Sequence, residues 1–195
     1  MMLSTCAPLE AVEADAALVR AKQGDAAAFE AILREHQSMV FSVAYHFAGD
    51  RAAAEDVAQD VFFELFRVIA QIDSTAHLVS WLRRVAVHRC IDRFRKRRFE
   101  SPYEPAAMEP RTHDRPRDVL FDERIRREIQ ELPSHARAVM VLRFQEDLDP
   151  REIAEALGMP VNTVKSHIRR SVDVLRERLD VPAAVKTPAG KQERE

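Results

Sequence analysis

The stretch from Asp149 to Leu179 constrains the fold of this chain more than any other, because two helices and the turn between them can be placed in it almost residue by residue. Asp149 can accept hydrogen bonds at a helix start, and Pro150 needs no amide donor in the first helical position. Glu152 can bond back to the cap. Gly158 can end the helix in the left-handed conformation. The sequence therefore predicts a helix from about Pro150, followed by a turn of about three residues.

A second helix opens at Pro160 and has two unlike faces. Its apolar side chains recur at offsets of three or four and form one inward stripe: Val161, Val164, Ile168, Val172 and Leu175. The other face is polar and basic: Asn162, Thr163, Ser166, Arg169 and Arg170, with Lys165 and His167 at its flanks. Two helices joined by a tight turn, the second polar and basic outside, are typical of a helix-turn-helix DNA reader. The alternative is an ordinary helical hairpin with a solvated basic face.

Composition favours a helical protein. The chain has 195 residues, 46% of them hydrophobic and 32% charged, with only 4 glycines. That is enough apolar material for real cores, and it suits helices better than sheets. The formal net charge of -2 hides a segregation. Acids crowd Glu10–Asp15, Asp50–Glu64 and Gln145–Glu155, while Arg83–Arg98 is almost uniformly basic. Such a protein can face a polyanion with one surface and a different partner with another.

Several classes of protein are disfavoured. Cys6 and Cys90 are too few for a disulfide framework, and the offset of two between His88 and Cys90 does not suit helical metal ligands, so neither a metal nor a cofactor is expected. No pocketed carboxylate pair, nucleophile elbow or phosphate-binding glycine loop indicates an enzyme. No run approaches the roughly 18 apolar residues of a membrane span, and the N-terminus lacks the order of a secretion signal. The chain is expected to be cytoplasmic, without membrane insertion.

The N-terminal half is expected to contain several helices. Asp15 can cap a short helix that stops at Gly24, and Asp25 can cap a second. Asp50 can cap a third, whose buried stripe is Val57, Val61, Leu65, Val68 and Ile69. Away from that stripe lie Asp56, Gln59, Asp60 and Phe63. An exposed aromatic ring beside a row of acids indicates a protein-binding face. A solvated face with Phe63 partly covered by a neighbour is the alternative.

A basic helix follows the polar segment Gln71–His77. Its apolar stripe packs it against the preceding helices: Leu78, Trp81, Leu82, Val85 and Ala86. Around and beyond Cys90 the cations accumulate: Arg89, Arg93, Arg95, Lys96, Arg97 and Arg98. They exceed what a helix dipole needs, and phosphate contacts with a polyanion would relieve their mutual repulsion. A solvated basic helix end is the alternative.

A proline-rich segment divides the chain. Its prolines alternate with charged and small residues, so it cannot bury a core and is expected to be a flexible linker between separate domains. After it, Pro133 ends one helix and Ser134 can cap the next, which turns Val139, Leu142 and Phe144 inward. The sequence predicts an all-α fold of two small helical domains: a tail at 1–14, a domain at 15–99, the linker at 100–117, a helix-turn-helix domain at 118–180 and a disordered tail at 181–195.

Four segments in this order resemble the extracytoplasmic-function sigma factors of bacterial RNA polymerase. AEDVAQDVFFELF (Ala54–Phe66) is similar to the family's polymerase-binding helix, and WLRRVAVHRCIDRFRKRR (Trp81–Arg98) to its promoter-melting and minus-ten segment. ELPSHARAVMVLRF (Glu131–Phe144) and REIAEALGMPVNTVKSHIRRS (Arg151–Ser171) are similar to its minus-thirty-five reader. The resemblance spans about residues 15–180. It implies a promoter-specificity subunit that directs core polymerase to promoters and melts the minus-ten element.

The resemblance also implies sites and partners. Polymerase would be bound by Asp56, Gln59, Asp60 and Phe63. The minus-ten element would be bound by Arg83, Arg84, His88, Arg89, Arg93, Arg95 and Arg97. The minus-thirty-five element would be bound by Asn162, Thr163, Lys165, Ser166, Arg169 and Arg170. The loop Gln71–His77 would capture an unstacked base. The partners would be core polymerase, through its beta-prime clamp helices and beta flap, promoter DNA and an anti-sigma factor.

The chain departs from the family pattern at positions that bear on base preference. His88 stands where members often have Asn, Asn162 where Gly is common, and His167 where Arg is common. Two rival interpretations remain. A conventional operator-binding regulator would need no second basic helix, and a sigma-factor mimic that titrates an inhibitor would not need both DNA-facing surfaces to stay basic.

Overall fold

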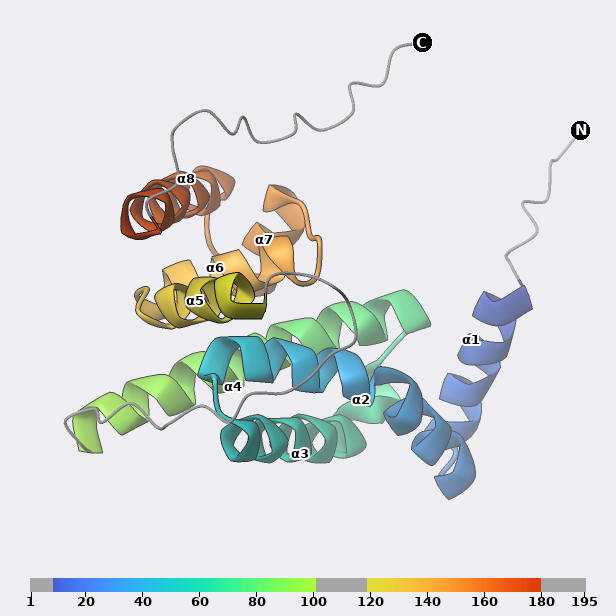
Figure 1. Cartoon of the computed structure of the whole chain (residues 1–195). Coiled ribbons are helices and arrows are strands. Elements are labelled where there is room, and N and C mark those ends of the chain that lie inside the picture. Colours follow the sequence, from blue (N-terminus) through green and yellow to red (C-terminus); the bar gives the residue numbers. More distant parts are fainter. Residues whose placement is uncertain (1–8, 101–118, 180–195) are drawn as a thin grey trace, which may run out of the picture.

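The computed structural model describes residues 9–100 and 119–179, and every regular element in these two ranges is helical (Figure 1). The predicted all-α fold is confirmed. The predicted tails and proline-rich linker lie largely outside the described residues. Among the helices that are described, none combines the length and the hydropathy needed to cross a bilayer.

The N-terminal unit consists of α1 (Leu9–Lys22), α2 (Ala26–Ala48), α3 (Arg51–Val68), the short 3-10 helix η1 (Ile69–Gln71) and α4 (Thr75–Glu100). Asp25 and Asp50 cap α2 and α3 through hydrogen bonds to backbone amides, as predicted. Of the predicted α3 stripe, Val57, Val61, Leu65 and Ile69 are buried. The helices pack around a core that includes Phe47 and Leu82.

The start of α1 was predicted wrongly. The helix begins at Leu9, so Asp15 lies inside it and caps nothing of its own helix. Instead, the Asp15 carboxylate accepts hydrogen bonds from Thr75 at the start of α4. The sequence could not distinguish these roles, because a carboxylate can cap any helix whose first amides come within reach.

The C-terminal unit consists of α5 (Val119–Gln130), α6 (Ser134–Phe144), α7 (Pro150–Leu157) and α8 (Val161–Arg178). The capping box predicted for α7 is present: Asp149 accepts from the amides of Arg151 and Glu152, and the Glu152 side chain accepts from the amide of Asp149. Gly158 ends α7 in the left-handed region at φ 62°. The helix-turn-helix is therefore built as its local sequence dictates.

Two expectations for α6 are wrong. Pro133, rather than Ser134, occupies the N-cap position, and no side chain caps this helix. Phe144 is 59% exposed instead of turned inward. It lies at the last position of α6, beyond the stretch Ala136–Leu142 that the core covers. Val139 and Leu142 are fully buried, as predicted.

The two units, which we expected to be separate, share one hydrophobic core in this structure. In Figure 1, α6 and α7 lie over α4, and α6 also contacts α2. Arg137 of α6 is at the centre of the contact and is only 3% exposed. Its Nη1 donates to the carbonyl oxygen of Phe47 (3.0 Å) and its Nη2 to that of Leu132 (3.3 Å). The guanidinium carbon lies 4.2 Å from the ring centroid of Phe94 and 5.1 Å from that of Phe47.

Two further polar contacts cross between the units. Arg83 Nε of α4 lies 3.0 Å from Glu146 Oε2, in the turn after α6. Gln145 Nε2 donates to Ser42 Oγ of α2 over 3.0 Å. The interface thus combines a cation packed against two aromatic rings with an ion pair and a hydrogen bond that also cross between the units.

Candidate nucleic-acid interface

The second helix of the helix-turn-helix presents a continuous polar face. Val164 and Leu175 are buried, which sets the rotation of α8 on α6 and α7. That rotation exposes every side chain assigned to the upstream element: Asn162, Thr163, Lys165, Ser166, Arg169 and Arg170. The sequence periodicity therefore placed this face correctly, because an inward stripe at offsets of three and four leaves only one outward face.

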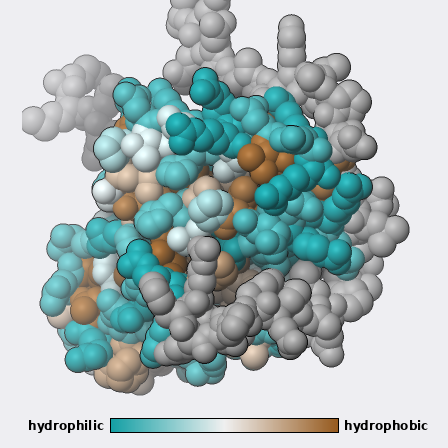
Figure 2. Space-filling view, turned by 90° about the vertical axis from the view of Figure 1, so that its left-hand side faces the viewer, coloured by the Kyte–Doolittle hydropathy of each residue, from teal (hydrophilic) through white to brown (hydrophobic). Residues whose placement is uncertain are grey.

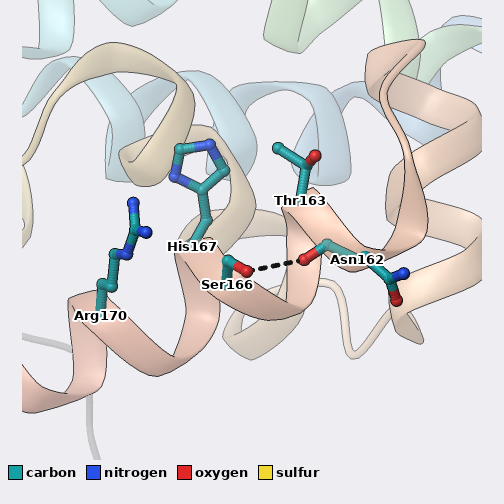
Figure 3. Close-up of a pocket in the computed structure, with 5 residues that line it drawn as sticks. All are labelled: Asn162, Thr163, Ser166, His167 and Arg170. Atoms are coloured by element: carbon teal, nitrogen blue, oxygen red, sulfur yellow. Dashed lines mark hydrogen bonds between the residues drawn. The ribbon is translucent and has the colours of Figure 1, made fainter.

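A shallow hollow of about 300 Å³ opens on this face of α8. It is lined by Asn162, Thr163, Ser166, His167 and Arg170, whose side chains Figure 3 shows along two turns of the helix. Ser166 Oγ donates to the carbonyl oxygen of Asn162 over 2.8 Å, so the hydroxyl keeps its acceptor lone pairs for an outside donor. The hollow therefore offers an amide, two hydroxyl groups and a guanidinium to a ligand.

His167 at the flank of this hollow is disposed to stay neutral. Burial lowers the pKa of His167, and electrostatic interactions with His135 and Arg170 lower it further. A neutral imidazole offers one donor and one acceptor, while the protonated ring only donates. His167 therefore contributes hydrogen bonding rather than a fixed cation at this position.

The basic side chains of α4 do not form a single surface. Arg84, His88 and Arg95 are exposed and share one helix face. His88 Nδ1 lies 2.8 Å from the carbonyl oxygen of Arg84, which fixes Nδ1 as the donor and directs Nε2 outward. Arg83 is turned toward Glu146 of the other unit. The Arg97 side chain lies outside the described residues.

Two arginines of α4 are ion-paired with α3. Arg89 Nε donates to Glu64 Oε2 over 3.1 Å, and its Nη2 also contacts that oxygen. Arg93 contacts Asp56 and lies 4.0 Å from Asp60 Oδ2. The hydrogen bonding that Arg89 donates to the Glu64 carboxylate raises the pKa of Arg89. The structure therefore pairs Arg93, which was assigned to DNA, with two acids that were assigned to polymerase binding, and the sequence did not indicate this pairing.

The exposed face of α3 carries two aromatic rings rather than one. Asp56, Gln59 and Asp60 are exposed, as predicted, and Phe63 is 65% exposed. Phe66 is equally exposed at 65%, and its ring meets Phe29 edge-on at 5.5 Å. The offset of three between the two phenylalanines was the sequence signal that could have identified Phe66 as part of this face.

The side of the molecule at the left of Figure 1 is mostly hydrophilic where the structure describes it. Figure 2 shows this side of the molecule, with its hydrophobic atoms in small separate groups. A surface of this kind suits a charged, hydrated partner better than an apolar one.

The loop between η1 and α4 is anchored at both ends and exposed between them. Ile72 is 1% exposed, and its amide donates to the Ile69 carbonyl oxygen over 3.1 Å. The backbone amide of His77 donates to Ser74 Oγ over 3.2 Å. The His77 side chain accepts, through Nδ1, from the backbone amide of Asp73 over 3.1 Å. Local hydrogen bonds therefore hold the backbone from which the exposed loop side chains project.

Fold and surfaces together define a class: a helical DNA-binding protein with a helix-turn-helix in one unit and a separate basic helix in the other. Comparison with known families agrees. Residues 32–100 match the family model Sigma-70 region 2, and residues 122–173 match Sigma-70, region 4.

Relatives cover nearly the whole chain. It is 31% identical over 172 residues to ECF RNA polymerase sigma factor SigW of Bacillus subtilis, an alignment that covers 81% of this chain and 92% of that protein. It is 30% identical over 182 residues to ECF RNA polymerase sigma factor SigK of Mycolicibacterium vanbaalenii, covering 89% and 93%. The chain belongs to the extracytoplasmic-function (ECF) sigma factors, the transcription initiation factors that direct RNA polymerase to promoters.

Solved structures share the fold. The sigma factor RpoE in complex with the anti-sigma factor NepR from Bartonella quintana superposes with a TM-score of 0.68 at 20% identity, covering 79% of this chain and 98% of that one. CnrH in complex with the cytosolic domain of CnrY gives a TM-score of 0.63 at 24% identity, covering 87% and 99%.

Proposed function

We propose that this sigma factor reads the upstream promoter element with the polar face of α8. The observation that carries the proposal is the simultaneous exposure of six side chains on α8: Asn162, Thr163, Lys165, Ser166, Arg169 and Arg170. Asn162, Thr163, Ser166 and Arg170 also line the hollow. An α-helix fits the major groove, where amide, hydroxyl and guanidinium groups can meet base edges and phosphates. With His167 neutral, base preference at its position would rest on hydrogen bonding rather than on charge.

The minus-ten element would be held along α4. Arg84, His88 and Arg95 face solvent together and could meet DNA without rearrangement. Arg89 and Arg93 would first have to leave their carboxylates on α3, and Arg83 would have to leave Glu146. Arg97 completes the set proposed from the sequence. The loop Gln71–His77 would hold the unpaired base, and its contacts would offset the cost of unstacking.

Core polymerase would dock on α3. Asp56, Gln59 and Asp60 provide a polar, acidic surface, and Phe63 provides apolar anchorage. Aromatic anchors surrounded by charged residues are the usual composition of a protein-binding hot spot. The expected counterpart is basic, because complementary charge sets orientation and association rate. The beta-prime clamp helices would be that counterpart, and the beta flap would meet the C-terminal unit.

An anti-sigma factor would be the regulatory partner. RpoE and CnrH, which share the fold, were solved with an anti-sigma factor and with a cytosolic protein domain, respectively. This chain would act in the cytoplasm with polymerase, without a cofactor or catalytic chemistry of its own.

Transcription with purified core polymerase on a promoter library tests the proposal. The chain should initiate run-off transcripts from a small set of promoters that share two spaced elements. An operator-binding regulator would instead bind DNA without polymerase and start no transcript. Absence of any transcript from a folded preparation would contradict the proposed function.

A further inference from the structure

The first turn of α4 is capped by a residue from a different helix. Thr75 donates two hydrogen bonds to Asp15 Oδ1 of α1, one from its backbone amide (3.0 Å) and one from its hydroxyl (2.6 Å). Ser74, at the N-cap position, makes the usual local bond and accepts from the amide of His77 through its Oγ. The free amides at the start of α4 are therefore divided between a neighbouring side chain and one that lies 60 residues earlier.

This cap lies directly beside the loop that joins η1 to α4. On its η1 side the loop is held by buried Ile69 and Ile72. On its α4 side the contact to Asp15 ties it to α1, and α1 itself packs on both η1 and α4 with Leu18 buried. Between these anchors, Gln71 and Asp73 are exposed. The hydrogen bonds to Asp15 are thus the contact by which α1 adds to the local bonds that hold this loop.

We propose that Asp15 is a positioning residue for base capture by the segment Gln71–His77, which consists of the end of η1, the loop at residues 72–74 and the first residues of α4. The inference rests on the proposed function, in which this loop holds an unpaired promoter base. Asp15 would not touch the base. It would fix the start of α4, so that the loop is ordered before DNA arrives and the ordering cost is not taken from the binding free energy. The hydrogen bonds from Thr75 also lower the pKa of Asp15, so the capping carboxylate stays ionised near neutral pH.

The test compares holoenzymes that carry the full-length chain or its Asp15→Ala variant. The DNA is a fork junction that contains a promoter recovered from the transcription library. Each unpaired minus-ten position is replaced in turn by an abasic site. For each protein, the dissociation constant of the abasic DNA divided by that of the intact DNA measures base capture. We expect Asp15→Ala to reduce this ratio about fivefold at the captured position, the effect typical of a lost helix cap. Affinity for a duplex with only the upstream element should not change.

Asp25→Ala is the matched control. Asp25 caps α2 with bonds of 2.9 and 3.1 Å to the amides of Ala27 and Ala28, in the same unit but away from the loop. It should leave the ratio unchanged. Asp15→Asn keeps an oxygen acceptor and should restore part of the ratio. Hydrogen exchange in the free protein should be faster in Asp15→Ala at the amides of residues 71–78, with little change elsewhere.

The outcomes separate this proposal from the broader one. If the wild type discriminates but Asp15→Ala discriminates equally well, Asp15 does not position the loop and the inference is wrong. If Asp25→Ala lowers the ratio as much as Asp15→Ala does, the effect is general stability and the inference is also wrong. If the wild type transcribes but shows no captured base, the assignment of the loop fails, and the role of Asp15 fails with it. If it does not transcribe at all, the proposed function itself has failed.

Discussion

The buried Arg137 provides the strongest test of how the two units are held together. Charge-assisted hydrogen bonds contribute roughly 1.5–3 kcal/mol each, and a desolvated cation–π contact adds on the order of 1–2 kcal/mol. Arg137 makes two of each kind, while desolvation of its guanidinium costs several kcal/mol in the opposite direction. The balance of these contributions predicts that Arg137→Ala lowers the free energy of unfolding by about 3 kcal/mol.

The assay uses the single tryptophan of the chain. Trp81 lies in the N-terminal unit and is 9% exposed, so the main change in its fluorescence reports unfolding of that unit, while circular dichroism reports helices in both units. In the wild type the two urea transitions should coincide, because the units share a core. In Arg137→Ala the dichroism signal should fall first, as the C-terminal unit detaches. Arg143→Ala on the same helix, which removes contacts only within the C-terminal unit, should leave the two transitions coincident.

Coincident transitions in Arg137→Ala, with a loss of less than about 1 kcal/mol, would refute this reasoning. That result would mean that the apolar contacts between α4 and the helices above it hold the units together without the guanidinium.

Further predictions concern DNA, polymerase and pH. Arg170→Ala should weaken upstream-element binding by about 1–3 kcal/mol and relax the base preference at one base pair, measured on duplexes with single base-pair substitutions. An equal loss of affinity for every sequence would mean that Arg170 contacts only phosphate, and no loss would mean that it is not part of the site. Asp60→Arg should abolish co-purification with core polymerase while leaving circular dichroism intact, and unchanged co-purification would exclude this residue from the docking face. Burial and the charge of Arg126 lower the pKa of His46 to about 4. As the pH falls below about 6.5, His46 is therefore protonated in the unfolded chain but stays neutral in the folded protein. Lowering the pH from 7.5 to 5.0 should decrease the free energy of unfolding, measured by urea titration, by about 2 kcal/mol. If His46→Gln loses as much stability over that range as the wild type, His46 is not the group responsible.

The sequence predicted most accurately those features that depend on neighbours along the chain. The helix-turn-helix was placed closely because Asp149, Glu152 and Gly158 act on amides and carbonyls within a few residues. The outward face of α8 followed from periodicity in the same way. Phe63 was identified as exposed because its neighbours on the same face are charged.

Features that depend on contacts between distant segments were not predictable. Nothing in the local pattern of α6 distinguishes Arg137 from a solvent-facing arginine, since it is buried by Phe47 and Phe94 from the other unit. Asp15 looked like the cap of its own helix because the acceptor chemistry is identical for α1 and α4. In the same way, charge alone could not reveal that Arg89 would pair with Glu64 across two helices.

The ion pairs between α3 and α4 affect how the free protein responds to salt. A cation that already holds a carboxylate displaces fewer condensed ions when it meets a phosphate, and each full phosphate contact contributes roughly 0.9 to the slope of log affinity against log salt. Arg89 and Arg93 should therefore contribute less than their formal charge while Glu64 and Asp56 retain them. A partner that takes over these carboxylates would raise the effective valence of α4 toward DNA without moving the helix, and the salt slope would record the change.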